Sequence, residues 1–235
     1  MSKKNVIAID GSSASGKSTI TKILAHRLNF YYINTGKMYR ILTLKIIEEN
    51  PDWLLFFNFD DSFYSKQITS ISMDFNLHNK EIVPSINNNC NGLNSKIYSE
   101  NVSKSVSIIS KNKKIRNFMV AKQRLLSEKF DNIILEGRDI GTCVFPNANY
   151  KFYLIALLKT RINRRVNQII KNNKLLNYDA IYKSIEEDIK NRDEIDSTRN
   201  ISPLKPAKDA IIIKCDDLNK EDIVNIIINK MNISY

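Results

Sequence analysis

Residues 11–18 read GSSASGKS and fit the pattern GxxxxGK[ST]. In such a loop, consecutive backbone N–H groups and the N-terminus of the following helix face phosphate oxygens. The Lys17 side chain adds a mobile positive charge, and the Ser18 hydroxyl is a ligand type that suits Mg²⁺. The run therefore predicts a loop that binds the phosphates of a nucleoside triphosphate. A serine-rich turn that caps a helix is the alternative interpretation.

Arginines gather near the glycines outside this loop. Arg40 ends NTGKMYR, Arg138 lies in LEGRDIGT, and Arg192 and Arg199 flank Asp196. A guanidinium holds phosphate oxygens through two parallel hydrogen bonds, which an ammonium cannot do. Arginines kept at these places in a lysine-rich chain indicate a second anion site. A third group is formed by Arg161, Arg164 and Arg165 in RINRR.

The helical pattern after residue 178 turns from apolar to ionic along one face. That face carries Ile181, Ile185, Ile189, Arg192, Asp196 and Arg199. Inward-facing charges need partners, and an anionic ligand beside an arginine, aspartate and arginine stack would supply one. The alternative is a frayed helix end in water.

Two anion sites and a magnesium ligand together predict phosphoryl transfer from a triphosphate to a phosphate acceptor. A phosphate oxygen is already anionic at neutral pH, so catalysis needs alignment and charge neutralisation rather than a base. Glu136 ends the apolar run NIILE, where its carboxylate could contact Mg²⁺ through a water molecule.

Alternating apolar runs and helical patterns must position these residues. They predict strands at 5–10, 30–33, 131–136, 150–155 and 210–215, and helices at 17–28, 36–49, 94–109, 113–129, 160–172, 178–196 and 220–231. This order is typical of an α/β fold with a parallel sheet. Residues 68–92 break the alternation and favour a small antiparallel insert, with a disordered loop as the alternative for 87–92.

The whole chain has 235 residues and a net charge of +11, which suits one domain and a polyanionic partner without choosing that partner. No apolar run is long enough for a membrane span, and the first residues show no cleavable signal, so we expect a cytoplasmic protein. Cys90, Cys143 and Cys215 stand singly, and we expect reduced thiols rather than a zinc site.

Six segments resemble, in this order, the bacterial cytidylate kinase family. They are IDGSSASGKST, NTGKMYR, SVSIISKNKKIRNFMVAKQR, LEGRDIGTCVFPNA, RINRR and NRDEIDSTRNISPLKPAKDA, and they cover nearly the whole chain. The resemblance implies a P-loop kinase domain over residues 1–235, with a five-stranded parallel sheet flanked by helices, an insert at about 62–92 and a short helical lid at about 160–178. It also implies a cytoplasmic monomer that converts MgATP and CMP or dCMP to ADP and a diphosphate, and that binds neither nucleic acid nor membrane.

The resemblance also assigns residues. It implies ATP binding by Gly11, Ser12, Ser13, Ala14, Ser15, Gly16, Lys17, Ser18, Thr19 and Arg164, and CMP binding by Thr35, Tyr39, Arg40, Ser107, Arg116, Arg138, Asp139, Arg192, Asp196 and Arg199. Lys17, Arg138, Arg164 and Arg192 would be catalytic, and Ser18, with Glu136 through water, would hold Mg²⁺.

For the base, the resemblance points to three residues, and their chemistry agrees with it. The exocyclic amine of cytosine needs acceptors, which Ser107 and Asp139 provide, whereas the ring nitrogen and carbonyl need a donor, which Arg116 provides. Uracil reverses two of these roles. A mismatch that leaves a buried group unpaired costs about 1 to 3 kcal/mol.

Three positions depart from the family pattern. Asn34 replaces a usual aspartate, Tyr98 stands where arginine is common, and Lys214 stands where an acidic residue is frequent. We expect these changes to alter local contacts and turnover more than the class of reaction.

Two other classes of protein fit parts of the sequence. A uridylate, adenylate or shikimate kinase would share the phosphate loop and differ in its acceptor. A P-loop GTPase or RNA-binding regulator would explain the basic charge, but the chain shows neither an NKxD nor a DxxG segment and no aromatic residues interleaved with the basic ones.

Overall fold

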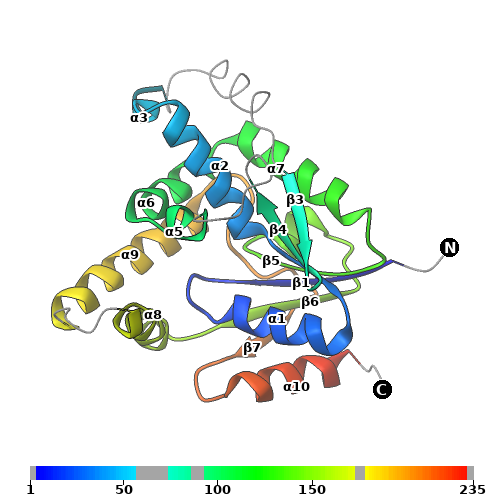
Figure 1. Ribbon diagram of the computed structural model, residues 1–235. Coiled ribbons are helices and arrows are strands. Elements are labelled where there is room, and N and C mark those ends of the chain that lie inside the picture. The colour runs from blue at the N-terminus through cyan, green and yellow to red at the C-terminus, as the bar shows by residue number, and fades with distance from the viewer. Residues whose placement is uncertain (1–3, 57–73, 86–92, 173–177, 232–235) are drawn as a thin grey trace.

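The computed structural model describes residues 4–56, 74–85, 93–172 and 178–231 (Figure 1). The strands are β1 (Asn5–Gly11), β2 (Tyr31–Asn34), β3 (Asp74–His78), β4 (Glu81–Ser85), β5 (Asn132–Gly137), β6 (Tyr150–Ile155) and β7 (Ile211–Lys214). The helices are α1 (Lys17–Leu28), α2 (Thr35–Glu49), α3 (Trp53–Phe56), α5 (Leu93–Ile97), α6 (Glu100–Ile109), α7 (Lys113–Ser127), the π-helix η1 (Ile140–Val144), α8 (Leu158–Asn172), α9 (Tyr178–Thr198) and α10 (Lys220–Lys230).

The strands form one sheet in the order β3-β4-β2-β5-β1-β6-β7. The five strands from β2 to β7 run parallel, which confirms the predicted α/β class and parallel sheet. The insert is an antiparallel β3–β4 hairpin, and β4 extends the same sheet by pairing in parallel with β2. The rest of the predicted insert, 62–73 and 86–92, lies outside the described residues.

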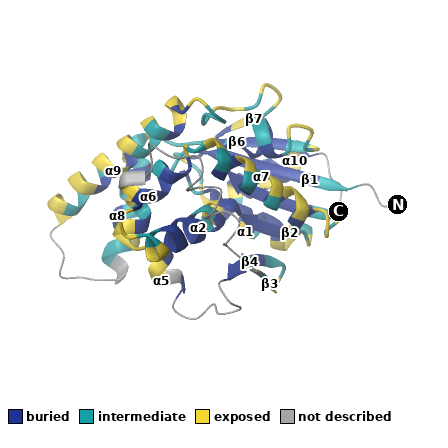
Figure 2. Ribbon diagram, turned by 90° about the horizontal axis from the view of Figure 1, so that it is seen from above, coloured by how far each residue is buried: buried dark blue, intermediate teal, exposed yellow. Residues whose placement is uncertain are grey.

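Alternation along the central strands divides the core between the two faces of the sheet. Ile7 and Ile9 of β1 pack in a cluster with α1 and α10, whereas Val6 and Ala8 pack in a cluster with α2, α6 and α7. Figure 1 shows α1 and α10 together on one side of the sheet and α2 and α7 on the other. The central strands are buried on both faces, as Figure 2 shows, because helices cover both.

Helices α8 and α9 form a separate small cluster beyond the end of β1. Its buried members are Ile162, Val166, Ile185 and Ile189. The outward face of α9 is exposed (Figure 2). These two helices cover the predicted lid apart from 173–177, which lie outside the described residues.

One predicted helix, at 94–109, is two helices in the structure. The chain leaves the helical path at Tyr98 and Ser99, and Ser99 becomes the N-cap of α6 by accepting a hydrogen bond from the Val102 N–H. Serine favours this capping position over a helix interior, which accounts for the break. The short α3 and η1 were not predicted.

In the part of the chain that the structure describes, no helix is long and apolar enough to cross a membrane. Cys143 and Cys215 are free thiols, while Cys90 lies outside the described residues.

Alanine at Gly11 is expected to lower the free energy of unfolding by about 3 kcal/mol. Gly11 has a φ of 151°, and a Cβ there would collide with the carbonyl oxygen of Leu154 on the neighbouring strand. Urea unfolding of the variant measures the loss. Gly36→Ala, at an exposed position in α2, is the matched control and should stay within about 1 kcal/mol of the wild type. Equal stability of the two variants would contradict this account of Gly11.

Candidate active site

The loop between β1 and α1 presents free backbone donors at a helix N-terminus. Gly16, the residue before α1, adopts a left-handed conformation with φ 96°, and no side chain caps the helix. The first turn also carries no acidic residue. The first N–H groups of α1 therefore remain available for an anion, and the helix dipole favours one.

Lys17 is folded back onto this loop. Its Nζ donates to the Ser12 carbonyl and to the Ser15 hydroxyl, 3.1 Å away. Burial lowers the pKa of Lys17 well below its usual value, and the nearby charge of Arg138 lowers it further. Anionic phosphates beside Lys17 would favour its charged form.

Two arginines of α8 donate hydrogen bonds to backbone carbonyls of the same loop. Arg161 donates to the Ser13 carbonyl at 3.2 Å and pairs with Asp193 of α9. Arg164 donates to the carbonyls of Ser15 at 3.1 Å and Cys215 at 2.6 Å. The next arginine of the cluster, Arg165, donates to the side chain of exposed Gln168 at 3.3 Å.

Asp196 lies at the centre of the predicted arginine cluster. Its carboxylate accepts from Arg138 Nε at 3.0 Å and lies 3.4 Å from a terminal nitrogen of Arg199. Burial raises the pKa of Asp196, but the charges of Arg138, Arg192 and Arg199 outweigh it and hold the pKa below its ordinary value. The stack expected from the helical spacing is therefore present, with Asp196 ionised.

The cluster carries more positive charge than its own carboxylate neutralises. Burial lowers the pKa of Arg40 to about 9 and that of Arg192 to about 10, and in each case another arginine lowers it further. Buried Nε of Arg192 and a terminal nitrogen of Arg199 have no hydrogen-bond partner. Unpartnered buried donors and mutual repulsion are both relieved by an anion, so this cluster is suited to bind one.

Arg40 is held by the segment where the predicted helix is broken. One guanidinium nitrogen donates to the Ile97 carbonyl at 2.8 Å and to the Ser103 hydroxyl at 2.9 Å. The Tyr98 ring lies 4.8 Å from the centre of the guanidinium. The departure to tyrosine at position 98 thus places a ring, rather than another cation, against Arg40.

A buried ion pair joins α7 to the start of η1. Arg116, 2% exposed, pairs with Asp139, and it lies over the Tyr39 ring with its centre 5.6 Å from that of the ring. Arg116 also donates to the carbonyl of Ser110, whose hydroxyl donates to the carbonyl of Ser107. Arg116 Nε and the Tyr39 hydroxyl are buried without partners, so the group retains polar atoms for a ligand.

The ends of β2 and β5 bring a carboxylate close to the phosphate loop. Glu136 is 3% exposed, and one of its oxygens accepts from the Tyr32 hydroxyl while the other has no partner. The Asn34 amide lies 3.4 Å from the Ser18 hydroxyl. Thr35 donates its hydroxyl proton to the Glu136 carbonyl at 2.7 Å, so its side chain does not donate to a ligand.

The structure gathers most of the predicted site residues at the carboxyl ends of the parallel strands. Arg138 and Arg192 lie close enough to Lys17 for their charges to lower its pKa. Arg164 contacts the phosphate loop, and Arg116 contacts Asp139. Ser107 is buried in the last turn of α6, and Ser110 links it to Arg116, since Ser110 donates to the Ser107 carbonyl and accepts from Arg116.

Sequence reasoning missed two residues that organise this region. They are Asp10, whose carboxylate accepts from the backbone of η1, and Tyr32, whose hydroxyl donates to Glu136. For both, the available signal was a polar group at or near the end of an apolar strand. Arg161 was singled out within RINRR, but its contact with the phosphate loop was not predicted.

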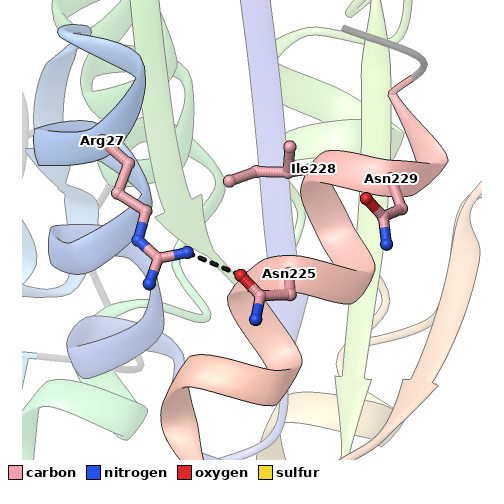
Figure 3. A pocket seen from close by; sticks show the side chains of 4 residues that line it. All are labelled: Arg27, Asn225, Ile228 and Asn229. Atoms are coloured by element: carbon pink, nitrogen blue, oxygen red, sulfur yellow. Dashed lines mark hydrogen bonds between the residues drawn. The ribbon is translucent and has the colours of Figure 1, made fainter. Parts of the chain in front are cut away.

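A separate hollow lies between α1 and α10 and is lined by Arg27, Asn225, Ile228 and Asn229 (Figure 3). Arg27 donates to the Asn225 side chain at 2.6 Å and pairs with Glu221. Arg27 is near the end of α1 opposite to the phosphate loop, about 15 Å along the helix. None of the predicted site residues lines this hollow.

Comparison with known proteins agrees with the geometry. The family described as cytidylate kinase matches residues 7–233. The cytidylate kinase of Fusobacterium nucleatum is 41% identical over 96% of both chains, and that of Bacillus subtilis is 35% identical over 96% of this chain and 95% of its own length. A bifunctional pantoate ligase/cytidylate kinase of Prochlorococcus marinus is 39% identical over 99% of this chain, which spans 44% of that longer protein.

Proposed function

Since the chain belongs to the cytidylate kinase family and is a phosphotransferase acting on CMP or dCMP, we propose how its residues divide that reaction. MgATP binds at the phosphate loop, and the acceptor binds between the arginine cluster and the Arg116–Asp139 pair. The observation that carries this proposal is the place of Arg138. It is ion-paired with Asp196 on the acceptor side, and its charge acts on Lys17 on the ATP side.

On the ATP side, the backbone of residues 11–19 surrounds the phosphates. Lys17 exchanges its contacts with Ser12 and Ser15 for contacts with phosphate oxygens. The negative phosphates stabilise the charged form of its side chain. Arg164 lies beside both the loop and Cys215, so its guanidinium contacts either the adenine or the transferring phosphate.

On the acceptor side, Arg40, Arg138 and Arg199 bind the monophosphate. Asp196, Arg192 and Tyr39 bind the sugar hydroxyls. The unpartnered Nε of Arg192 and hydroxyl of Tyr39 are available to form these hydrogen bonds. Ser107, Arg116 and Asp139 read cytosine. Thr35 borders the monophosphate without donating to it, since its hydroxyl proton is bonded to Glu136.

Magnesium fits the residues at the ends of β2 and β5. The Ser18 hydroxyl would hold the ion directly, and the unpartnered oxygen of buried Glu136 would hold one of its water molecules. When bound, the ion neutralises charge on the phosphates of ATP. Among the described residues, no cluster of three or more His, Cys, Asp or Glu side chains offers a different metal site.

The chemistry that remains for the protein is alignment and neutralisation. The acceptor oxygen is anionic, so no residue has to remove a proton from it. Lys17, Arg138, Arg164 and Arg192 supply positive charge where charge develops on the transferred group. The cluster is buried enough that these charges are weakly screened.

The organisation around the site is also part of the proposal. Residues 160–178 act as the lid and residues 62–92 as the insert on the acceptor side, within one domain over residues 1–235. We also propose that the protein acts as a monomer. Its substrates are free nucleotides, so we place the protein in the cytoplasm, with no nucleic-acid or membrane partner.

Rates with a panel of phosphate acceptors test the proposed recognition of cytosine. With ATP and magnesium, kcat/KM from ADP release should be about 10 to 100-fold higher for CMP and dCMP than for UMP, because uracil leaves Asp139 or Arg116 without its partner. AMP and shikimate should be poorer still. An equal or better rate with UMP, AMP or shikimate would overturn the roles of Ser107, Arg116 and Asp139.

A further inference from the structure

Asp10 is a buried carboxylate that the proposed catalytic roles do not use. It is the last residue but one of β1, directly before the phosphate loop, and is 4% exposed. Its two oxygens accept separate hydrogen bonds, from the Ile140 N–H at 2.8 Å and the Gly141 N–H at 2.7 Å. Both donors therefore bond to a residue about 130 positions earlier in the chain.

These two donors are the first N–H groups of η1. The residue before η1, Asp139, does not cap it with its own side chain, which pairs with Arg116 instead. The N-terminus of η1 is thus capped by the Asp10 side chain of β1. A π-helix is a rarely adopted geometry that local sequence does not favour by itself, so an external acceptor pair is well placed to fix where η1 begins.

The residues directly before η1 are Arg138 and Asp139. Arg138 reaches Asp196, and Asp139 reaches Arg116, so both side chains leave the backbone at the point that Asp10 anchors. Gly137 before them has no room for a side chain, because a Cβ would press on Ile140 and the Thr35 hydroxyl. The backbone from 137 to 141 is therefore fixed on one side by packing and on the other by Asp10.

Burial opposes the ionisation of Asp10. Burial raises its pKa to about 6, although the two backbone hydrogen bonds lower it; the neighbouring charge of Asp139 raises it, and that of Lys17 lowers it. A carboxyl whose folded pKa lies above its unfolded pKa stabilises the fold at low pH, and that contribution is lost as the pH rises through about 6. At neutral pH the burial of an ionised Asp10 thus lowers the free energy of unfolding.

We propose that Asp10 is a positioning residue that fixes the start of η1 to the strand carrying the ATP loop, and so places Arg138 and Asp139 against the acceptor. This proposal rests on the acceptor roles assigned above to those two residues. It makes the residue next to the triphosphate loop a determinant of how the protein binds the monophosphate.

Asp10→Asn and Asp10→Ser test the proposal. Each removes the charge, and neither can accept both N–H groups as the carboxylate does. We expect KM for CMP to rise about tenfold while KM for ATP stays within about twofold. Amide exchange in residues 138–144 should become about tenfold faster. The thermal unfolding midpoint at pH 7 should stay within about 5 °C of the wild type, since a buried charge has been removed.

Ser127→Ala is the matched control. It removes a buried hydrogen bond, from the Ser127 hydroxyl to the Gln123 carbonyl, at the far end of α7. It should lower the unfolding midpoint and change neither KM. Equal rises in both KM values, unchanged exchange in 138–144, or loss of folding in both Asp10 variants would overturn the proposal. Wild-type protein that does not prefer CMP would instead overturn the acceptor roles, so the two failures are distinguishable.

Discussion

Alanine in place of Lys17 is expected to lower kcat for CMP phosphorylation by about 10³-fold. The Lys17 ammonium is the mobile charge of the phosphate loop, and its two contacts are to atoms of that loop. Its contribution is realised as charge develops on the transferred phosphoryl group, so kcat should fall more than the affinity for either nucleotide. Steady-state rates at saturating ATP and CMP measure the effect.

The same substitution should leave the fold intact. Burial and Arg138 lower the pKa of Lys17, and a lysine with a lowered folded pKa destabilises the fold wherever it is charged. We therefore expect an unfolding midpoint equal to or above that of the wild type. Lys22→Ala removes a surface lysine on the same helix as Lys17, where Lys22 pairs with Glu81 of β4. It is the control and should keep the wild-type rate. A Lys17→Ala enzyme within tenfold of wild-type kcat would contradict the assigned role.

Methionine in place of Arg116 is expected to raise KM for CMP about 100-fold and to destabilise the fold by about 3 kcal/mol. Arg116 is buried and paired with Asp139, so its removal leaves an uncompensated buried carboxylate. It also removes the donor proposed for the ring nitrogen and carbonyl of cytosine. Urea unfolding and CMP titration of the initial rate measure the two effects separately.

The double variant Arg116→Met/Asp139→Asn separates the ion pair from base recognition. With both charges gone, most of the lost stability should return, because no buried charge is left unpaired. KM for CMP should remain high, because the groups that read cytosine are still missing. Recovery of CMP affinity together with stability would show that Arg116 acts only on the fold.

The sequence alone predicted the elements whose signals are local. β1, β5 and β6 are apolar runs in the core of the sheet, and each was placed to within a residue or so of its observed limits. The phosphate loop followed from its glycines, and the stack at Asp196 followed from helical spacing. These features depend on residues that are near one another in the chain.

The features that were missed depend on partners far apart in the chain. η1 begins where Asp10 accepts its first N–H groups, from 130 and 131 positions away. Tyr32 meets Glu136 only because β2 and β5 are neighbours in the sheet. The break between α5 and α6 is local in origin, but a serine inside an apolar helical pattern is also compatible with a continuous helix.

The small core shared by α8 and α9 favours local unfolding of these two helices before the sheet opens. Four buried aliphatic side chains and the Arg161–Asp193 ion pair hold these helices to each other, whereas the sheet is covered by two much larger clusters. Separating α8 from α9 thus exposes less apolar surface and requires less free energy than opening the sheet. We therefore expect amide exchange in α8 and α9 to be faster than in the central strands of the sheet.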